Sequence, residues 1–365
     1  MSSRLSRLVR QYVTFAVCFT NVIVLLVLIN VGFVALRWVY RLVKSDQIVA
    51  LRQAYPGKSD DEIRALFAET WSGSWQYSSW VGFRETPRRG PRVNVTDEGY
   101  RLTHRKDLDL AADGIKVFVF GGSTTFGYGV ADEETIPAWL QKRLDALYPD
   151  RKIQVFNFGR GYYFSTQEVT LLQQLLREGK RPDITVFVDG LNEGQSEPYY
   201  YTAMSLAFEG LNTKPSVLLR MYADTTATSR GLKKILGKKE AGVLEQAVSP
   251  QRTVQIFEHN RRVVRLLARE FDFTSYFFIQ PIPAYRNSFG KHPFLPNGWP
   301  PGVEEHLTES LTLMDRLADG KDTFSLTGLF EKYSKLPFVD ELHYTSAACD
   351  MIAAGIAREL RIPQR

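Results

Sequence analysis

Residues 115–125 of the chain read IKVFVFGGSTT. The first six form a short apolar run, which is typical of a strand buried on both faces of a sheet. Two glycines and Ser123 follow directly, where that strand should end. Similar apolar runs recur at 153–158, 184–188 and 276–279, and segments with helical spacing separate them. This alternation predicts an α/β fold with a mostly parallel sheet that is covered by helices on both faces.

Local signals indicate where the intervening helices begin and end. Residues 135–147 carry apolar side chains at helical spacing. Ser165 and Glu168 are spaced as a capping box at the start of the next helix. A long amphipathic helix is expected at about 250–270, and a last helix at about 346–360.

These elements place the α/β domain at residues 114–365. The alternation of strands and helices is interrupted by an insertion at about 195–248, whose middle part is rich in Lys and Arg. Because the insertion follows the third strand, it is either a lid over the ligand-binding edge or a solvated surface loop. Residues 46–113 are polar and aromatic and are expected to form a stalk and collar that packs on the domain. The collar has three tryptophans that either stack on carbohydrate or simply pack: Trp71, Trp75 and Trp80.

The charge of the chain is concentrated at its N-terminal end. The chain has 46 Lys and Arg against 40 Asp and Glu, and residues 1–44 hold six of the basic side chains and no acidic one. The rest of the chain therefore has no net charge, and it lacks the excess of basic side chains that is typical of a nucleic-acid-binding protein. The two cysteines, Cys18 and Cys349, provide no disulfide framework.

Residues 11–36 contain no charged side chain and are mostly apolar. A helix of this length spans the roughly 30 Å hydrocarbon core with some tilt, so we expect a single transmembrane anchor within residues 1–45. A cleaved signal peptide is the alternative, but the apolar run is long for one and no small-x-small cleavage site follows it. Basic residues flank both ends, so the positive-inside rule does not decide the orientation. A short tail before a single span usually stays in the cytoplasm, which would place the domain outside, in the periplasm of a bacterium.

Polar residues and glycines follow the predicted strand ends, which is where parallel sheets bind ligands. Cleavage of an ester by serine needs a base, a carboxylate that orients the base, and N–H donors for the oxyanion. Ser123 is the candidate nucleophile, His343 the base and Asp340 its carboxylate. The oxyanion donors would be the backbone N–H of Ser123, a backbone N–H at or next to Gly161, and the side-chain amide of Asn192.

No spacing typical of a metal or cofactor site accompanies these residues. The glycines at 121–127 lack the Lys-Ser/Thr pair of a phosphate-binding loop. The other histidines show no metal-ligand spacing: His104, His259, His292 and His306. We therefore expect neither a metal nor a cofactor.

Four segments resemble, in order and near the spacing, the four sequence blocks of the SGNH/GDSL hydrolases. They are residues 121–125, 157–167, 190–193 and 340–343. The Gly-Tyr-Arg element at 99–101 also resembles one that precedes the first block in membrane-anchored bacterial members. The resemblance implies a three-layer α/β/α fold and the chemistry of a serine esterase, deacetylase, lipase or acyltransferase.

The chain departs from the family pattern at three positions. Gly122 stands where the namesake motif has Asp, and Glu193 replaces the Asp that usually follows the third-block Asn. In the second block, counting from Asn157, the oxyanion glycine position falls on Tyr162 rather than Gly161. Because only a backbone N–H is required there, either of these two amides could serve.

The candidate triad predicts a serine esterase that acts through an acyl-enzyme, and the resemblance and the anchor together indicate its substrate. The expected substrate is an O-acetyl or other acyl group on a cell-envelope or exported glycan. Three alternatives remain: an O-acetyltransferase that uses the same triad, a lipid esterase near the bilayer, and a non-catalytic partner of a membrane assembly.

Overall fold

The structure is a computed structural model that describes residues 2–43, 46–193, 249–286, 292–296, 298–299 and 302–364. The described residues fall into two compact units, one containing residues 2–43 and the other containing the described residues from 47 onward. The insertion expected at 195–248 lies outside the described residues.

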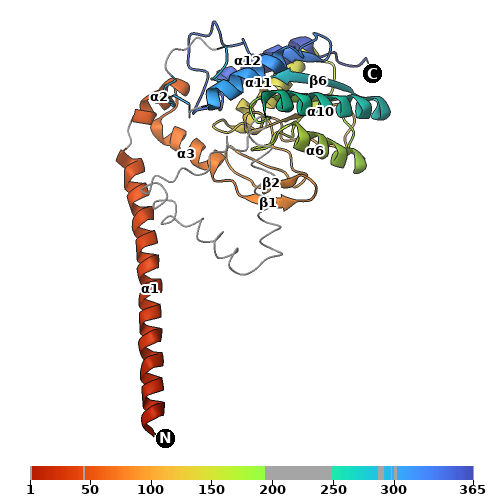
Figure 1. Ribbon diagram of the computed structural model, residues 1–365. Helices are drawn as coiled ribbons and strands as arrows, with labels where there is room; N and C mark the ends of the chain where they lie inside the picture. Colours follow the sequence, from red (N-terminus) through yellow and green to blue (C-terminus); the bar gives the residue numbers. More distant parts are fainter. Residues whose placement is uncertain are drawn as a thin grey trace. The chain divides into compact units, whose positions relative to one another are not determined.

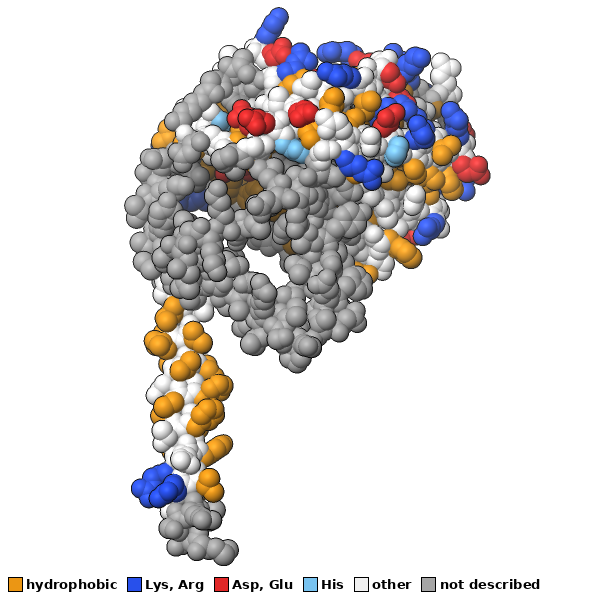
Figure 2. Space-filling model, viewed as in Figure 1, with side chains coloured by type: hydrophobic (Ala, Val, Ile, Leu, Met, Phe, Trp, Pro, Cys, Tyr) orange, Lys and Arg blue, Asp and Glu red, His pale blue; other side chains and the backbone are white. Residues whose placement is uncertain are grey.

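The described part of the first unit is the helix α1 (Ser2–Val43). Its segment Ser6–Gly32 has 27 residues with a mean hydropathy of 2.5, so it is long and apolar enough to cross a membrane. Apolar side chains are exposed along this segment (Figure 2). Such exposure is unfavourable in water, whereas a lipid environment would cover the same surface.

A parallel sheet of five strands forms the centre of the second unit (Figure 1). Its strands are β3 (Ile115–Gly121), β4 (Ile153–Asn157), β5 (Ile184–Asp189), β6 (Thr274–Ile279) and β7 (Thr323–Ser325). Their spatial order is β4-β3-β5-β6-β7, so the direction of winding reverses between β3 and β5. Ligands of such sheets bind in the crevice beyond the carboxyl ends of the strands at this reversal.

Helices cover both faces of the sheet, which confirms the predicted three-layer α/β/α fold. The helices against one face are α5 (Ile136–Leu147) and α12 (Ser346–Glu359), and those against the other are α6 (Ser165–Arg177) and α10 (Pro250–Phe271). A further helix, α11 (Val303–Asp315), packs beside α10 (Figure 1).

Alternate residues of β3 supply the two sides of the core. Val117 and Val119 belong to the cluster that includes residues of α5 and α12. Phe118 and Phe120 belong to the opposite cluster, with residues of α6 and α10. From Val117 onward both faces of the strand are buried and its residues are apolar, whereas Lys116 lies at a partly exposed position.

Residues 46–113, where the sequence predicts a stalk and collar, contain two helices and a β-hairpin. The elements are α2 (Asp46–Ala54), α3 (Asp60–Trp71), β1 (Trp75–Ser78) and β2 (Gly82–Glu85). Side chains of α3 pack against Val339, close to the candidate base. Val81, at the turn of the hairpin, is buried in the cluster that lies against α6.

Candidate active site

Ser123 begins the short helix α4 (Ser123–Phe126), directly after β3. Its side chain is partly exposed, and its Oγ lies 2.9 Å from Nε2 of His343. The helix ends at Gly127, whose φ of +94° lies in the left-handed region that favours glycine. The sharp change from strand to helix therefore presents the Ser123 hydroxyl at the carboxyl edge of the sheet.

Asp340 holds the imidazole of His343 through its other ring nitrogen. Oδ2 of Asp340 lies 2.8 Å from Nδ1 of His343. Oδ1 accepts the backbone N–H groups of Leu342 at 2.8 Å and of His343 at 2.7 Å. Burial acts to raise the pKa of Asp340, but His343 and these two N–H groups outweigh it and hold that pKa below its usual value. The ionised carboxylate favours a proton on Nδ1, which leaves Nε2 free to accept one from Ser123.

Two aromatic rings pack against the imidazole and limit its movement. Trp71, at the end of α3, makes an edge contact with His343 at a centroid distance of 5.1 Å. Tyr128, from the loop after α4, lies 5.5 Å from the same ring. His343 is only 6% exposed, so bulk water has little access to it.

Asn192 follows β5 and brings its side-chain amide to Gly122. Its Nδ2 donates one hydrogen bond to the carbonyl oxygen of Tyr163 at 2.7 Å, and the amide has a second hydrogen to donate. A Cβ at position 122 would lie 2.3 Å from this nitrogen. A side chain there would therefore require the amide to shift.

The structure distinguishes the two candidate amides of the second block. The N–H of Gly161 donates to Oε1 of Glu85 at 2.8 Å. Tyr162 has a φ of +62°, in the left-handed region, and no acceptor for its N–H is found among the described residues. The Gly161 amide is therefore already used, whereas the Tyr162 amide remains able to donate.

A cavity of about 410 Å³ opens beside these groups. Its lining includes Ser123, Asn192 and His343 together with an aromatic side formed by Trp71, Trp75 and Tyr162. These three residues are 46%, 39% and 59% exposed, so none of them is sealed in the core. Among the described residues, no cluster of His, Cys, Asp or Glu has the geometry of a metal site.

Glu193 has a larger structural role than the sequence indicates. It is buried, and its two oxygens accept the backbone N–H groups of Ser165 and Gly190, each at 2.9 Å. It thereby ties the turn that carries Asn192 to the start of α6.

The predicted capping box at the start of α6 is wrong. The N-cap is Phe164, whose side chain has no acceptor for a cap bond, and Glu193 binds the Ser165 N–H instead. Glu168 lies fully buried beside Asp189. Burial, and then the negative charge of neighbouring carboxylates, raises the pKa of both Glu168 and Asp189.

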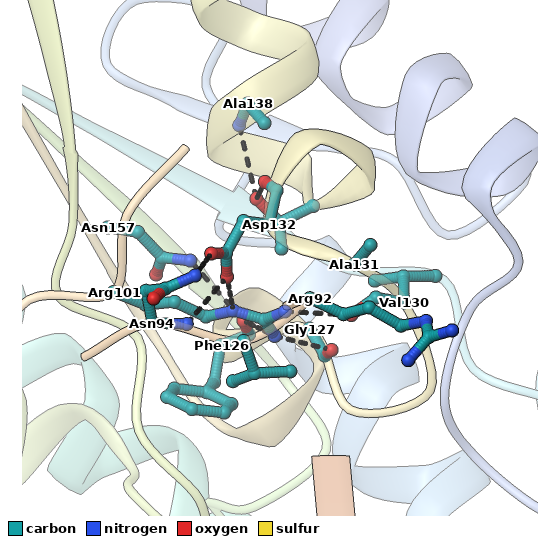
Figure 3. Close-up of polar contacts among 12 residues, drawn as sticks. Arg92, Asn94, Arg101, Phe126, Gly127, Val130, Ala131, Asp132, Ala138 and Asn157 are labelled. Atoms are coloured by element: carbon teal, nitrogen blue, oxygen red, sulfur yellow. Dashed lines mark hydrogen bonds and ion pairs between the residues drawn. The ribbon is translucent and has the colours of Figure 1, made fainter. Parts of the chain in front are cut away.

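Arg101, from the Gly-Tyr-Arg element, fixes the loop that follows the candidate nucleophile (Figure 3). Its guanidinium is 1% exposed and pairs with Asp132 at 2.8 Å. It also donates to the carbonyl oxygens of Phe126, Gly127 and Val130 at 2.7–2.9 Å. These bonds span the loop that carries Tyr128 and so support the ring that packs on His343.

We expect Arg101→Met to lower the free energy of unfolding by about 3–5 kcal/mol, because Asp132 would remain buried without its partner. Arg105→Met is the matched control. Arg105 pairs with the exposed Asp107, and such surface pairs contribute about 1 kcal/mol or less. Urea unfolding of both variants measures the difference, and equal losses would contradict the role of Arg101 as a buried clamp.

Comparison with known proteins gives similarities only among solved structures. No family model matches the chain, and no curated protein matches it. An Axe2 mutant, an acetyl-xylooligosaccharide esterase from Geobacillus stearmophilus, is 14% identical with a TM-score of 0.40, over 70% of this chain and 98% of its own. A protein assigned to the G-D-S-L lipolytic family from Desulfitobacterium hafniense DCB-2 is 14% identical with a TM-score of 0.38, over 67% and 99%.

A carbohydrate acetylesterase family member from Sinorhizobium meliloti is 16% identical with a TM-score of 0.37, over 67% of this chain and 96% of its own. The similar structures thus include the GDSL type that the sequence blocks indicate. They are esterases and lipolytic proteins.

Proposed function

We propose that the chain is a serine esterase of the SGNH type. The observation that carries the proposal is the continuous chain of contacts from Ser123 Oγ through the His343 imidazole to Asp340, at 2.9 and 2.8 Å. A serine hydroxyl is a weak nucleophile unless a neighbouring base removes its proton. Here the base is within hydrogen-bond reach, and an ionised carboxylate orients it.

The reaction follows from these positions. His343 takes the proton of Ser123 as Oγ attacks the ester carbonyl, and the resulting imidazolium returns it to the leaving alcohol. The oxyanion is bound by the N–H groups of Ser123 and Tyr162 and by the Asn192 amide. Water then attacks the acyl-enzyme while His343 takes its proton, and the imidazolium returns that proton to Ser123 Oγ as the carboxylic acid leaves.

We expect Asn192→Ala to lower kcat by roughly 10²–10³-fold with little change in KM, because its amide acts mainly on the transition state. Gly122→Ala provides a second route to the same loss, since its new Cβ would displace Nδ2 of Asn192. Steady-state kinetics with p-nitrophenyl acetate measure both variants. An effect confined to KM would instead assign Asn192 to substrate binding.

We infer an acylated saccharide as the substrate, and an O-acetyl group as the acyl part. The aromatic side of the cavity offers flat apolar surfaces next to Ser123, and the apolar faces of sugar rings pack on such surfaces. With α1 as a single-pass anchor and the α/β unit outside the cytoplasm, a cell-envelope or exported glycan would be within reach.

The substrate proposal predicts a selective effect of Trp75→Leu. KM for an O-acetylated oligosaccharide should rise by about 2–10-fold, as expected for the loss of one ring contact, while KM for p-nitrophenyl acetate should change little. Trp80→Leu is the matched control, because Trp80 belongs to the same hairpin but does not line the cavity. Equal effects on both substrates would contradict a saccharide-binding role.

The same assay, run on the full-length chain in detergent, separates the possible activities. Release of free acetate supports hydrolysis, whereas acetyl transfer to an added sugar would assign the same triad to a transferase. Faster turnover of phospholipid or triglyceride esters than of acetylated sugars would overturn the proposed substrate class.

A further inference from the structure

The hairpin β1–β2, which precedes the α/β sequence blocks, is bound to the second block. Tyr163 donates from its hydroxyl to the carbonyl oxygen of Phe83. Gln167 and Gln174 of α6 donate to the carbonyl oxygens of Val81 at 3.0 Å and Ser79 at 2.7 Å. These bonds fix the hairpin against the loop that contains the Tyr162 amide.

Glu85, the last residue of β2, contacts Gly161, the residue before Tyr162. It is 5% exposed, and its Oε1 accepts the Gly161 N–H at 2.8 Å. Burial raises the pKa of Glu85, and the opposing charges of Arg160 and Arg88 and the Gly161 N–H offset part of that rise. The carboxyl group has an oxygen that can accept this N–H in both its ionised and its protonated form.

The bond to Glu85 decides which amide of the loop is available. With the Gly161 N–H turned to Glu85, the free amide is that of the next residue, Tyr162. Tyr162 adopts a left-handed conformation, which costs a residue with a side chain about 1–2 kcal/mol and persists only where neighbouring contacts hold it. Packing also supports the loop, because the Trp75 ring lies where a Cβ of Gly161 would be.

We propose that Glu85 is a positioning residue for the oxyanion hole: by binding the Gly161 N–H, it holds the Tyr162 N–H in place to stabilise the oxyanion. This inference rests on the proposed esterase function. It also means that the hairpin before the sequence blocks is part of the active site, since the triad residues alone do not set the conformation of this loop.

The test compares Glu85→Ala with Glu85→Gln in the full-length chain, using p-nitrophenyl acetate. We expect Glu85→Ala to lower kcat by about 10–100-fold with little change in KM, because misplacing a donor by about 1 Å costs up to about 10²-fold. Glu85→Gln should retain most of kcat, because its amide oxygen can accept the same N–H. Ser74→Ala is the matched control, since it removes a hydroxyl contact with Thr86 at the open end of the same hairpin.

Inhibition by phenylboronic acid, which forms a tetrahedral adduct with an active-site serine, gives a second readout. Its inhibition constant should rise with Glu85→Ala in step with the fall in kcat/KM, and it should stay near the wild-type value with Glu85→Gln. A lower melting temperature with unchanged kcat in Glu85→Ala would overturn the positioning role, as would equal losses of kcat in the Ala and Gln variants. If the wild type itself lacks turnover that depends on Ser123, the proposed function fails, and the positioning role fails with it.

Discussion

Ser123→Ala should lower kcat for p-nitrophenyl acetate by at least about 10⁴-fold, and it should abolish covalent labelling by a fluorophosphonate probe. The hydroxyl is the only group of the protein that bonds to the acyl carbon in the proposed mechanism. Without it, the bound ester can react only with water, assisted by the remaining oxyanion donors. Folding should be unaffected, because the side chain is partly exposed and its recorded hydrogen bond is the one to His343.

The neighbouring hydroxyl provides the control for this variant. Thr124 donates to Oε1 of Gln280 at 2.7 Å, and that oxygen also accepts the hydroxyl of Tyr344 at 3.2 Å. Thr124→Val removes this hydroxyl, but Thr124 does not line the cavity, so labelling and turnover should persist. Unchanged turnover in Ser123→Ala, or equal loss in both variants, would rule out Ser123 as the nucleophile.

The sequence predicts the strands whose residues form a clear apolar run. The strands β3, β4, β5 and β6 are buried on both faces and appear as apolar runs, and their predicted ends lie within two residues of those observed. The edge strand β7 has only three residues, two of them polar, so its sequence contains no such run. The hairpin β1–β2 is also unpredicted, because its pairing depends on contacts with α6 that lie more than 80 residues away along the chain.

The candidate site is predictable to the extent that its residues follow strand ends. Ser123 and Asn192 follow neighbouring strands, and the order of the sheet brings those ends together. Glu85 and Arg101 could not be assigned in the same way. Their roles arise from burial and from bonds to backbone groups, which leave no spacing pattern in the sequence.

The second large effect is expected for Asp340→Asn, with a loss of about 10⁴-fold in kcat. Oδ1 of Asp340 accepts two backbone N–H groups, so the carbonyl oxygen of an asparagine must occupy that position. The asparagine NH₂ group then faces Nδ1 of His343 and donates to it. The proton of the neutral imidazole moves to Nε2, and that nitrogen can no longer accept the proton of Ser123.

The pH profile of kcat/KM tests this explanation. Because the pKa of Asp340 is held below its usual value of about 3.9, the carboxylate stays ionised above about pH 4 and should not itself titrate in the working range. Protonation of Asp340 should therefore not reduce wild-type activity at any pH above about 4. Asp340→Asn should remain low at every pH above about 4, since its defect is the position of the imidazole proton. The double variant Ser123→Ala/Asp340→Asn should be no slower than Ser123→Ala alone, because residues that act as one unit are not additive. Profiles of the same height for wild type and Asp340→Asn would show that Asp340 does not orient His343.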